Sequence, residues 1–110
     1  MPRFITFFSY TGEAAKAMIT RPSDRTAAAK ALVESVGGTL DGFYWMQGNH
    51  DGFLLTTVPD AVSGAALSAA AASTGLITRL ETHQIFSGDD QADIVKRAAT
   101  AVAAYRPPSA

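Results

Sequence analysis

The chain has 110 residues, of which 47% are hydrophobic and 17% charged, and its formal net charge is −1. Such a length and composition predict one globular domain over residues 1–110. The near-neutral charge argues against nucleic-acid binding. The aromatic residues do not change this expectation, because they do not interleave with Lys and Arg. The absence of cysteine excludes disulfides, thiolate zinc sites and cysteine nucleophiles. No apolar run reaches the ~20 residues of a membrane span and no signal peptide is recognised, so we expect a cytoplasmic protein without a membrane partner.

The first element is a strand, predicted over residues 3–10 from its aromatic and β-branched content. Both of its faces carry bulky apolar groups, so we expect it to be central and covered on both sides. The alternation assigns Phe4, Thr6, Phe8 and Tyr10 to one face and Arg3, Ile5, Phe7 and Ser9 to the other.

A helical stretch follows over residues 13–36, with Pro22 near its middle. Proline lacks an N–H and clashes with the preceding turn, so we expect a kink or a short break there. Ser23 or Asp24 can cap the second segment, and Gly37 ends it.

Residues 39–46 and 53–58 are predicted to form two strands joined by a polar turn of about four to six residues. The turn contains glycine, asparagine and aspartate, which tolerate positive φ. The sequence leaves the register open, since a slip by one residue would exchange the faces of Tyr44 and Trp45. Simple alternation places Leu40, Gly42, Tyr44 and Met46 on one face and Thr39, Asp41, Phe43 and Trp45 on the other.

The second half of the chain repeats the pattern of helix and strand. Asp60 caps an alanine-rich helix that ends at Gly75, and a strand is predicted over residues 76–86. A final amphipathic helix precedes a frayed tail over residues 106–110. One face of the last strand presents Ile77, Arg79, Glu81, His83 and Ile85.

The element order β-α-β-β-α-β predicts a ferredoxin-like α+β fold with a four-stranded antiparallel sheet and an added C-terminal helix. The helices suffice to cover one face of the sheet. The strands carry apolar residues on both faces, so we expect a second copy of the chain to cover the other face. The predicted assembly is a dimeric α+β barrel or a larger homo-oligomer.

The hairpin and its flanks resemble the GYD-domain family of small bacterial proteins, over nearly the whole chain from Phe4 to about Ile94. The Gly-x-Tyr-Asp signature corresponds to residues 48–51, where His50 occupies the tyrosine position. The resemblance implies a ferredoxin-like, dimeric barrel and brings with it no defined reaction. It is also carried by Gly37-Gly38, Gly42-Phe43-Tyr44 and Val58-Pro59-Asp60.

His50 and Asp51 are the first candidate site residues. One interpretation is a base with an orienting carboxylate, or half of a metal site. In the other, Asp51 fixes the turn through nearby amides while His50 packs as an aromatic ring. Adjacent residues of a strand point to opposite faces, which argues against direct cooperation.

Arg79, Glu81 and His83 share one strand face and form the strongest candidate site. They would line a polar pocket inside the barrel, or else form a row of ion pairs at an interface or exposed edge. His50, Glu81 and His83 have ligand types that suit zinc or iron. Nothing in the sequence brings His50 close to the other two, so no metal site is predicted.

An apolar ligand cavity with a polar tip would suit Tyr10, Tyr44, Trp45 and Met46, although aromatic residues at this spacing more often fill a core or an interface. The glycines form no nucleotide-binding fingerprint, and no cofactor is predicted. We expect a homo-oligomeric barrel protein that binds a small molecule between its sheets. The predicted ligand-binding residues are Tyr10, Tyr44, His50, Asp51, Arg79, Glu81 and His83.

The alternative is a small cofactor-free enzyme of the monooxygenase or isomerase type. In that hypothesis His83 or His50 acts as the base, and Arg79 holds an anionic substrate or enolate.

Overall fold

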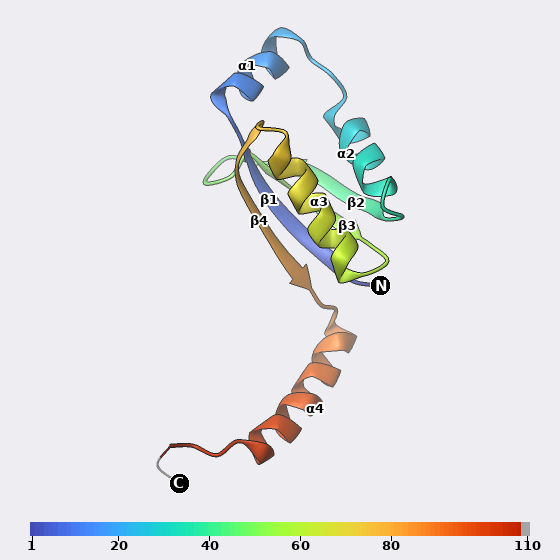
Figure 1. The fold of residues 1–110 in the computed structure, drawn as a ribbon, viewed down its shortest axis with the longest axis vertical. Helices are drawn as coiled ribbons and strands as arrows, with labels where there is room; N and C mark the ends of the chain where they lie inside the picture. The colour runs from blue at the N-terminus through green and yellow to red at the C-terminus, as the bar shows by residue number, and fades with distance from the viewer. Residues whose placement is uncertain (109–110) are drawn as a thin grey trace.

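The computed structural model describes residues 1–108 and contains a four-stranded antiparallel sheet in the order β2-β3-β1-β4 (Figure 1). This is the ferredoxin-like arrangement predicted from the element order. The strands are β1 (Arg3–Tyr10), β2 (Thr39–Trp45), β3 (Gly52–Thr57) and β4 (Ile77–Ile85). The helices are α1 (Gly12–Thr20), α2 (Arg25–Glu34), α3 (Ala61–Ser73) and α4 (Gly88–Ala104).

Helices α2 and α3 lie on the same side of the sheet (Figure 1), with α2 packed mainly on β2 and α3 mainly on β4. Their side of the sheet carries Phe8, which is 3% exposed, and the core continues through Val33 and Val58. We call this the helix face. The other side, the open face, is not covered by any helix of residues 1–108.

The break predicted at Pro22 is confirmed, because α1 ends at Thr20 and α2 begins at Arg25. Asp24 caps α2 by accepting a hydrogen bond of 3.0 Å from the backbone N–H of Ala27. The cap predicted at Asp60 is also present, with the N–H of Ser63 donating to its carboxylate at 2.8 Å.

Two irregularities make the simple alternation wrong at four residues, Thr39, Leu40, Asp41 and Ile77. The register of β2 shifts between Leu40 and Gly42, so Leu40 pairs with Thr56 of the helix face. Asp41 turns to the open face, where it accepts a hydrogen bond of 2.6 Å from the Thr57 hydroxyl. A second shift, opposite β1 residues 9–10, places Ile77 on the helix face and not beside Arg79. An extra residue in a strand reverses the faces of the residues beyond it, and sequence alternation does not reveal where it is inserted.

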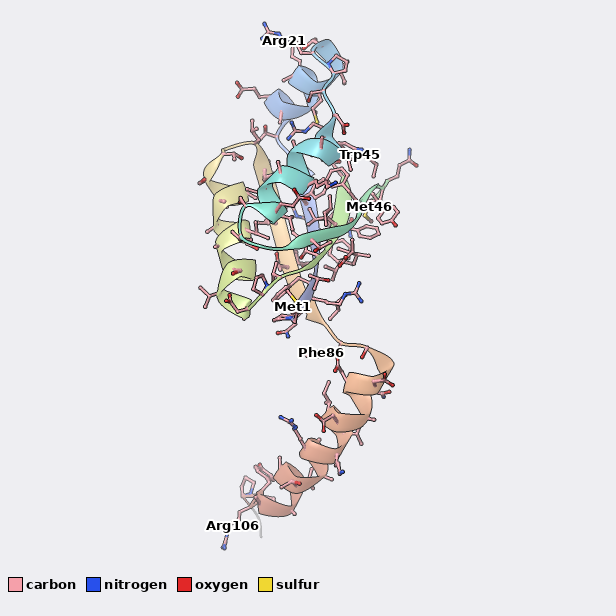
Figure 2. All side chains as sticks on the ribbon, turned by 90° about the vertical axis from the view of Figure 1, so that its right-hand side faces the viewer. Met1, Arg21, Trp45, Met46, Phe86 and Arg106 are labelled. Atoms are coloured by element: carbon pink, nitrogen blue, oxygen red, sulfur yellow. The ribbon has the colours of Figure 1, made fainter. Side chains whose placement is uncertain are left out.

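Helix α4 projects away from the sheet, and every described residue from 88 to 104 is exposed (Figure 1). Figure 2 shows Phe86 where the chain leaves the body, and Arg21 and Arg106 at opposite ends of the molecule. Among residues 1–108, no helix combines the length and the apolar character that crossing a bilayer requires. The tail predicted over residues 106–110 lies partly outside the described residues.

Candidate functional site

The loop between β2 and β3, residues 46–51, folds back onto the end of β1. The N–H of Asp51 donates to the carbonyl of Phe8 at 2.8 Å, and the Asp51 carboxylate accepts from the N–H of Tyr10 at 2.8 Å. Gly48 has φ +131°, a conformation that side chains disfavour. Asp51 therefore fixes the path of the loop, and this path determines where its neighbour His50 lies.

His50 lies over the open face against Phe7, with ring centroids 5.4 Å apart. Only 12% of its side chain is exposed. Its Nδ1 atom is 3.4 Å from the hydroxyl of Ser9. Ser9 is two residues after Phe7 on β1 and lies on the same face of the sheet. The histidine therefore packs as an aromatic ring and also keeps a polar partner at one nitrogen.

A single carboxylate lies between two imidazoles on the open face. Oε2 of Glu81 is 3.8 Å from Nε2 of His50 and 3.4 Å from Nε2 of His83. The sheet register explains this arrangement, because Glu81 pairs with Phe7, the residue beneath His50. Glu81 and His83 are two residues apart on β4 and point the same way. His50, Glu81 and His83 are called the His–Glu–His cluster below.

Arg79 of β4 contacts the β2–β3 loop next to the His–Glu–His cluster. Its Nη1 atom donates to the carbonyl of Asn49 at 3.2 Å, and the residue pairs with Ser9 in the sheet. The guanidinium thus supports the loop segment that carries His50 and adds a positive charge beside the cluster.

The seven predicted site residues separate into two groups. Tyr44 lies on the open face, stacked on Phe53 with centroids 5.1 Å apart. The ring centroids of Phe53 and Phe7 are 5.8 Å apart, so the rings of Tyr44, Phe53 and Phe7 form an aromatic row that leads to the cluster. Tyr10 belongs to the helix face and lines a separate hollow with Asp51. The open face therefore collects Tyr44, His50, Arg79, Glu81 and His83.

The approach of His50 to Glu81 and His83 could not be inferred from the sequence, because it depends on the loop bonds made by Asp51. The roles of Ser9 and Phe7 were missed for the same reason, although their alternation already assigned them to the face of the cluster. No group of three or more His, Cys, Asp or Glu residues in the described part of the chain is arranged to hold a metal ion.

The cluster brings together groups that carry protons, with the imidazoles of His50 and His83 on either side of one carboxylate. Imidazole is the side chain most often used as a general acid or base. His83 turns Nε2 toward Glu81 and leaves its side chain 57% exposed, so the other edge of the ring can meet a bound molecule.

The GYD domain matches residues 4–95. The chain belongs to the GYD-domain family. The match spans the four strands and α1 to α3, and it ends within α4. No curated protein matches the chain.

Two solved structures resemble this GYD-domain chain. The protein TTHA0845 of Thermus thermophilus is 16% identical, with a TM-score of 0.53 over 80% of this chain and 96% of its own. A 5-chloro-2-hydroxyhydroquinone dehydrochlorinase, TftG, of Burkholderia phenoliruptrix in complex with 2,5-dihydroxybenzoquinone is 15% identical, with a TM-score of 0.46 over 80% and 97% of the two chains. The first of these shows a shared fold.

Proposed function

We propose that this GYD-domain chain is a homo-oligomeric protein that binds a small molecule on the open face of its sheet, beneath a second copy of itself. The observation that carries the proposal is the apolar character of a face that no helix of residues 1–108 covers. Ile5, Phe7 and Leu55 are partly accessible there, and Tyr44 is 51% exposed. A contiguous apolar patch of this kind marks an interaction surface.

A second copy suits this surface because two identical sheets can meet about a two-fold axis, each presenting the same patch. The central aromatic row would be buried in such a pair. Glu81 and His83 of the His–Glu–His cluster lie on β4, at one edge of the sheet. With His50 of the β2–β3 loop beside them, they would line a pocket next to the buried row. Arg79 adds a positive charge there, which favours a guest with an anionic or strongly accepting group.

A cofactor-free enzyme is the second candidate function, and the His–Glu–His cluster favours it. His83 or His50 would take a proton from the substrate, Glu81 would stabilise the imidazolium, and Arg79 would hold the developing negative charge. This candidate uses the same pocket and the same assembly.

The assembly can be tested by placing a charge on the open face. Tyr44→Glu should shift the chain toward the monomer, because a buried unpaired carboxylate disfavours association. Val62→Glu is the matched control, since Val62 is 79% exposed on the outer side of α3. Light scattering coupled to size exclusion gives the mass of each variant, and circular dichroism verifies folding. Equal masses for Tyr44→Glu and the wild type would contradict the proposed interface.

The pocket is tested with His83→Ala and Arg79→Ala in a thermal-shift screen of small organic acids and phenols. A ligand that raises the wild-type melting temperature should fail to do so in both variants while their assembly survives. Gln84→Ala is the control, because Gln84 neighbours His83 on β4 but pairs with Phe4 of the helix face. Loss of assembly in the two variants would instead make these residues structural.

A further inference from the structure

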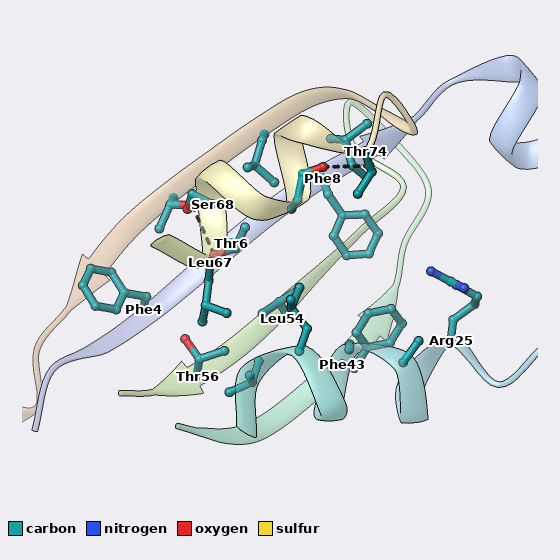
Figure 3. A pocket seen from close by; sticks show the side chains of 18 of the residues that line it. Phe4, Thr6, Phe8, Arg25, Phe43, Leu54, Thr56, Leu67, Ser68 and Thr74 are labelled. Atoms are coloured by element: carbon teal, nitrogen blue, oxygen red, sulfur yellow. Dashed lines mark hydrogen bonds between the residues drawn. The ribbon is translucent and has the colours of Figure 1, made fainter. Parts of the chain in front are cut away.

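A cavity of about 180 Å³ lies on the helix face, between the sheet and helices α2 and α3 (Figure 3). Phe4 and Phe8 of β1 and Leu54 of β3 line its sheet side, while Leu67 of α3 lines its helix side. Phe8 neighbours Phe7 on β1 and points the opposite way. The cavity is therefore separated from the His–Glu–His cluster by the thickness of the sheet.

The sequence explains why side chains do not fill this cavity. The helix surfaces that face it are built largely from small residues, including Ala28 and Ala29 of α2 and Ala71 of α3. At Gly64 the helix α3 lies so close that an added Cβ would be 2.8 Å from the ring of Phe4. The helix is thus held against β1 at one end, and its short side chains do not reach across the remaining space.

Arg25, the first residue of α2, lines the cavity and brings a positive charge to it (Figure 3). Its Nε atom is buried and has no hydrogen-bond partner within residues 1–108. None of the ion pairs found in that part of the chain involves Arg25. A buried donor without a partner is rare in folded proteins and is a mark of an incomplete interaction.

Three hydroxyl groups form a second polar feature of the wall. Thr82 Oγ1 lies 3.2 Å from Thr6 Oγ1 and 3.0 Å from Ser68 Oγ. Figure 3 shows Thr6 and Ser68 well removed from Arg25, with Phe8 and Leu54 between them. The cavity therefore has a cationic end, an apolar middle and a weakly polar wall.

We propose that this cavity binds a single-ring aromatic carboxylate, with the carboxylate on Arg25 and the ring among Phe8, Leu54 and Leu67. The volume fits one ring with a small substituent, because an apolar protein cavity of about 150 Å³ holds benzene. A carboxylate offers the Arg25 guanidinium two hydrogen-bond acceptors and a negative charge to pair with its positive one. This site is independent of the one proposed on the open face.

The proposal is tested with two probes of nearly the same shape, 4-methylbenzoate and p-xylene. The second has a methyl group where the first has its carboxylate. Methyl NMR of the full-length protein should show both probes shifting Leu54 and Leu67. Leu55 follows Leu54 on β3 but points to the open face, so it should not respond. Arg25→Gln should weaken 4-methylbenzoate at least about ten-fold, the effect of one charge-assisted hydrogen bond, and leave p-xylene unchanged.

Ala71→Leu provides a second variant, which fills the cavity without touching the charge. It should abolish binding of both probes, and if it fails to fold, the comparison of Arg25→Gln with the wild type still decides. The proposal would be overturned if neither probe shifts the cavity residues, if 4-methylbenzoate shifts Leu55 instead, or if Arg25→Gln weakens the two probes equally.

Discussion

At the scale of single residues, Gly52 shows how closely the hairpin approaches β1. A Cβ built there would lie 2.7 Å from the ring of Phe8 and would also collide with the carbonyl of Tyr44. The contact with Phe8 joins the hairpin that carries His50 to the buried core. A side chain at this position would force the two apart.

Gly52→Ala is therefore expected to lower the free energy of unfolding by about 1–3 kcal/mol, the usual range for overpacking. Urea unfolding followed by circular dichroism measures this. Gly12→Ala is the control, because no atom lies within 4 Å of the added Cβ. The control should be stabilised by about 0.5 kcal/mol through a less flexible unfolded chain. Similar effects for both variants would contradict the close approach.

Asp60 gives the protein a pH-dependent component of stability. Hydrogen bonds from the backbone N–H and the side chain of Ser63 lower the pKa of its carboxyl below the ordinary value. Because the folded-state pKa lies below the unfolded one, this stability is present above the unfolded value of about 4 and is lost as the pH falls through the folded value.

Asp60→Asn retains an oxygen that can cap α3 but removes the titration. Its melting temperature should therefore fall less steeply than that of the wild type as the pH is lowered from about 5 to about 2. Thermal unfolding at several pH values measures the two slopes. Equal slopes would show that the cap contributes nothing to acid sensitivity.

At the scale of elements, the helices differ sharply in their dependence on the sheet. Val33 of α2 is 2% exposed, whereas Val102 of α4 is 73% exposed. Val33→Ala should cost about 2 kcal/mol of stability, from lost burial and the cavity left behind. Val102→Ala should remain within about 0.5 kcal/mol of the wild type. Denaturant unfolding compares the pair, and a large loss at Val102 would show that α4 packs on something.

Removal of α4 extends the same test to a whole element. A chain ending at Ser87 should keep the stability of the full chain within about 1 kcal/mol, because the exposed helix buries little surface. Its mass in solution is measured alongside its unfolding. A truncated chain that no longer assembles would mean that α4 belongs to the interface between copies.

The order and type of the elements could be predicted because local signals were strong. Pro22, the Asp60 cap and the aromatic strand of residues 3–10 each have a direct physical meaning. The faces of Leu40, Asp41 and Ile77 could not be predicted, because a bulge depends on pairing between strands. The cavity was also unpredictable. It depends on the spacing between the helices and the sheet, which is a tertiary property that no local sequence signal sets.

At the scale of the whole molecule, the candidate site was predictable only in part. Arg79, Glu81 and His83 were placed on one face by alternation, which the structure preserves beyond Ile77. His50 joined them through the backbone bonds of Asp51, a contact between distant parts of the chain. The same sheet separates the two proposed sites, with the His–Glu–His cluster on the open face and Arg25 on the helix face.

The central claim is that a second copy covers the open face. Sedimentation velocity of the full-length chain over a wide range of concentrations tests it most directly, since the single chain has a mass of 11.5 kDa. We predict a species of twice that mass or more, which Tyr44→Glu converts to the single chain and Val62→Glu does not. A folded wild-type species that stays at 11.5 kDa at the highest attainable concentration would contradict the claim.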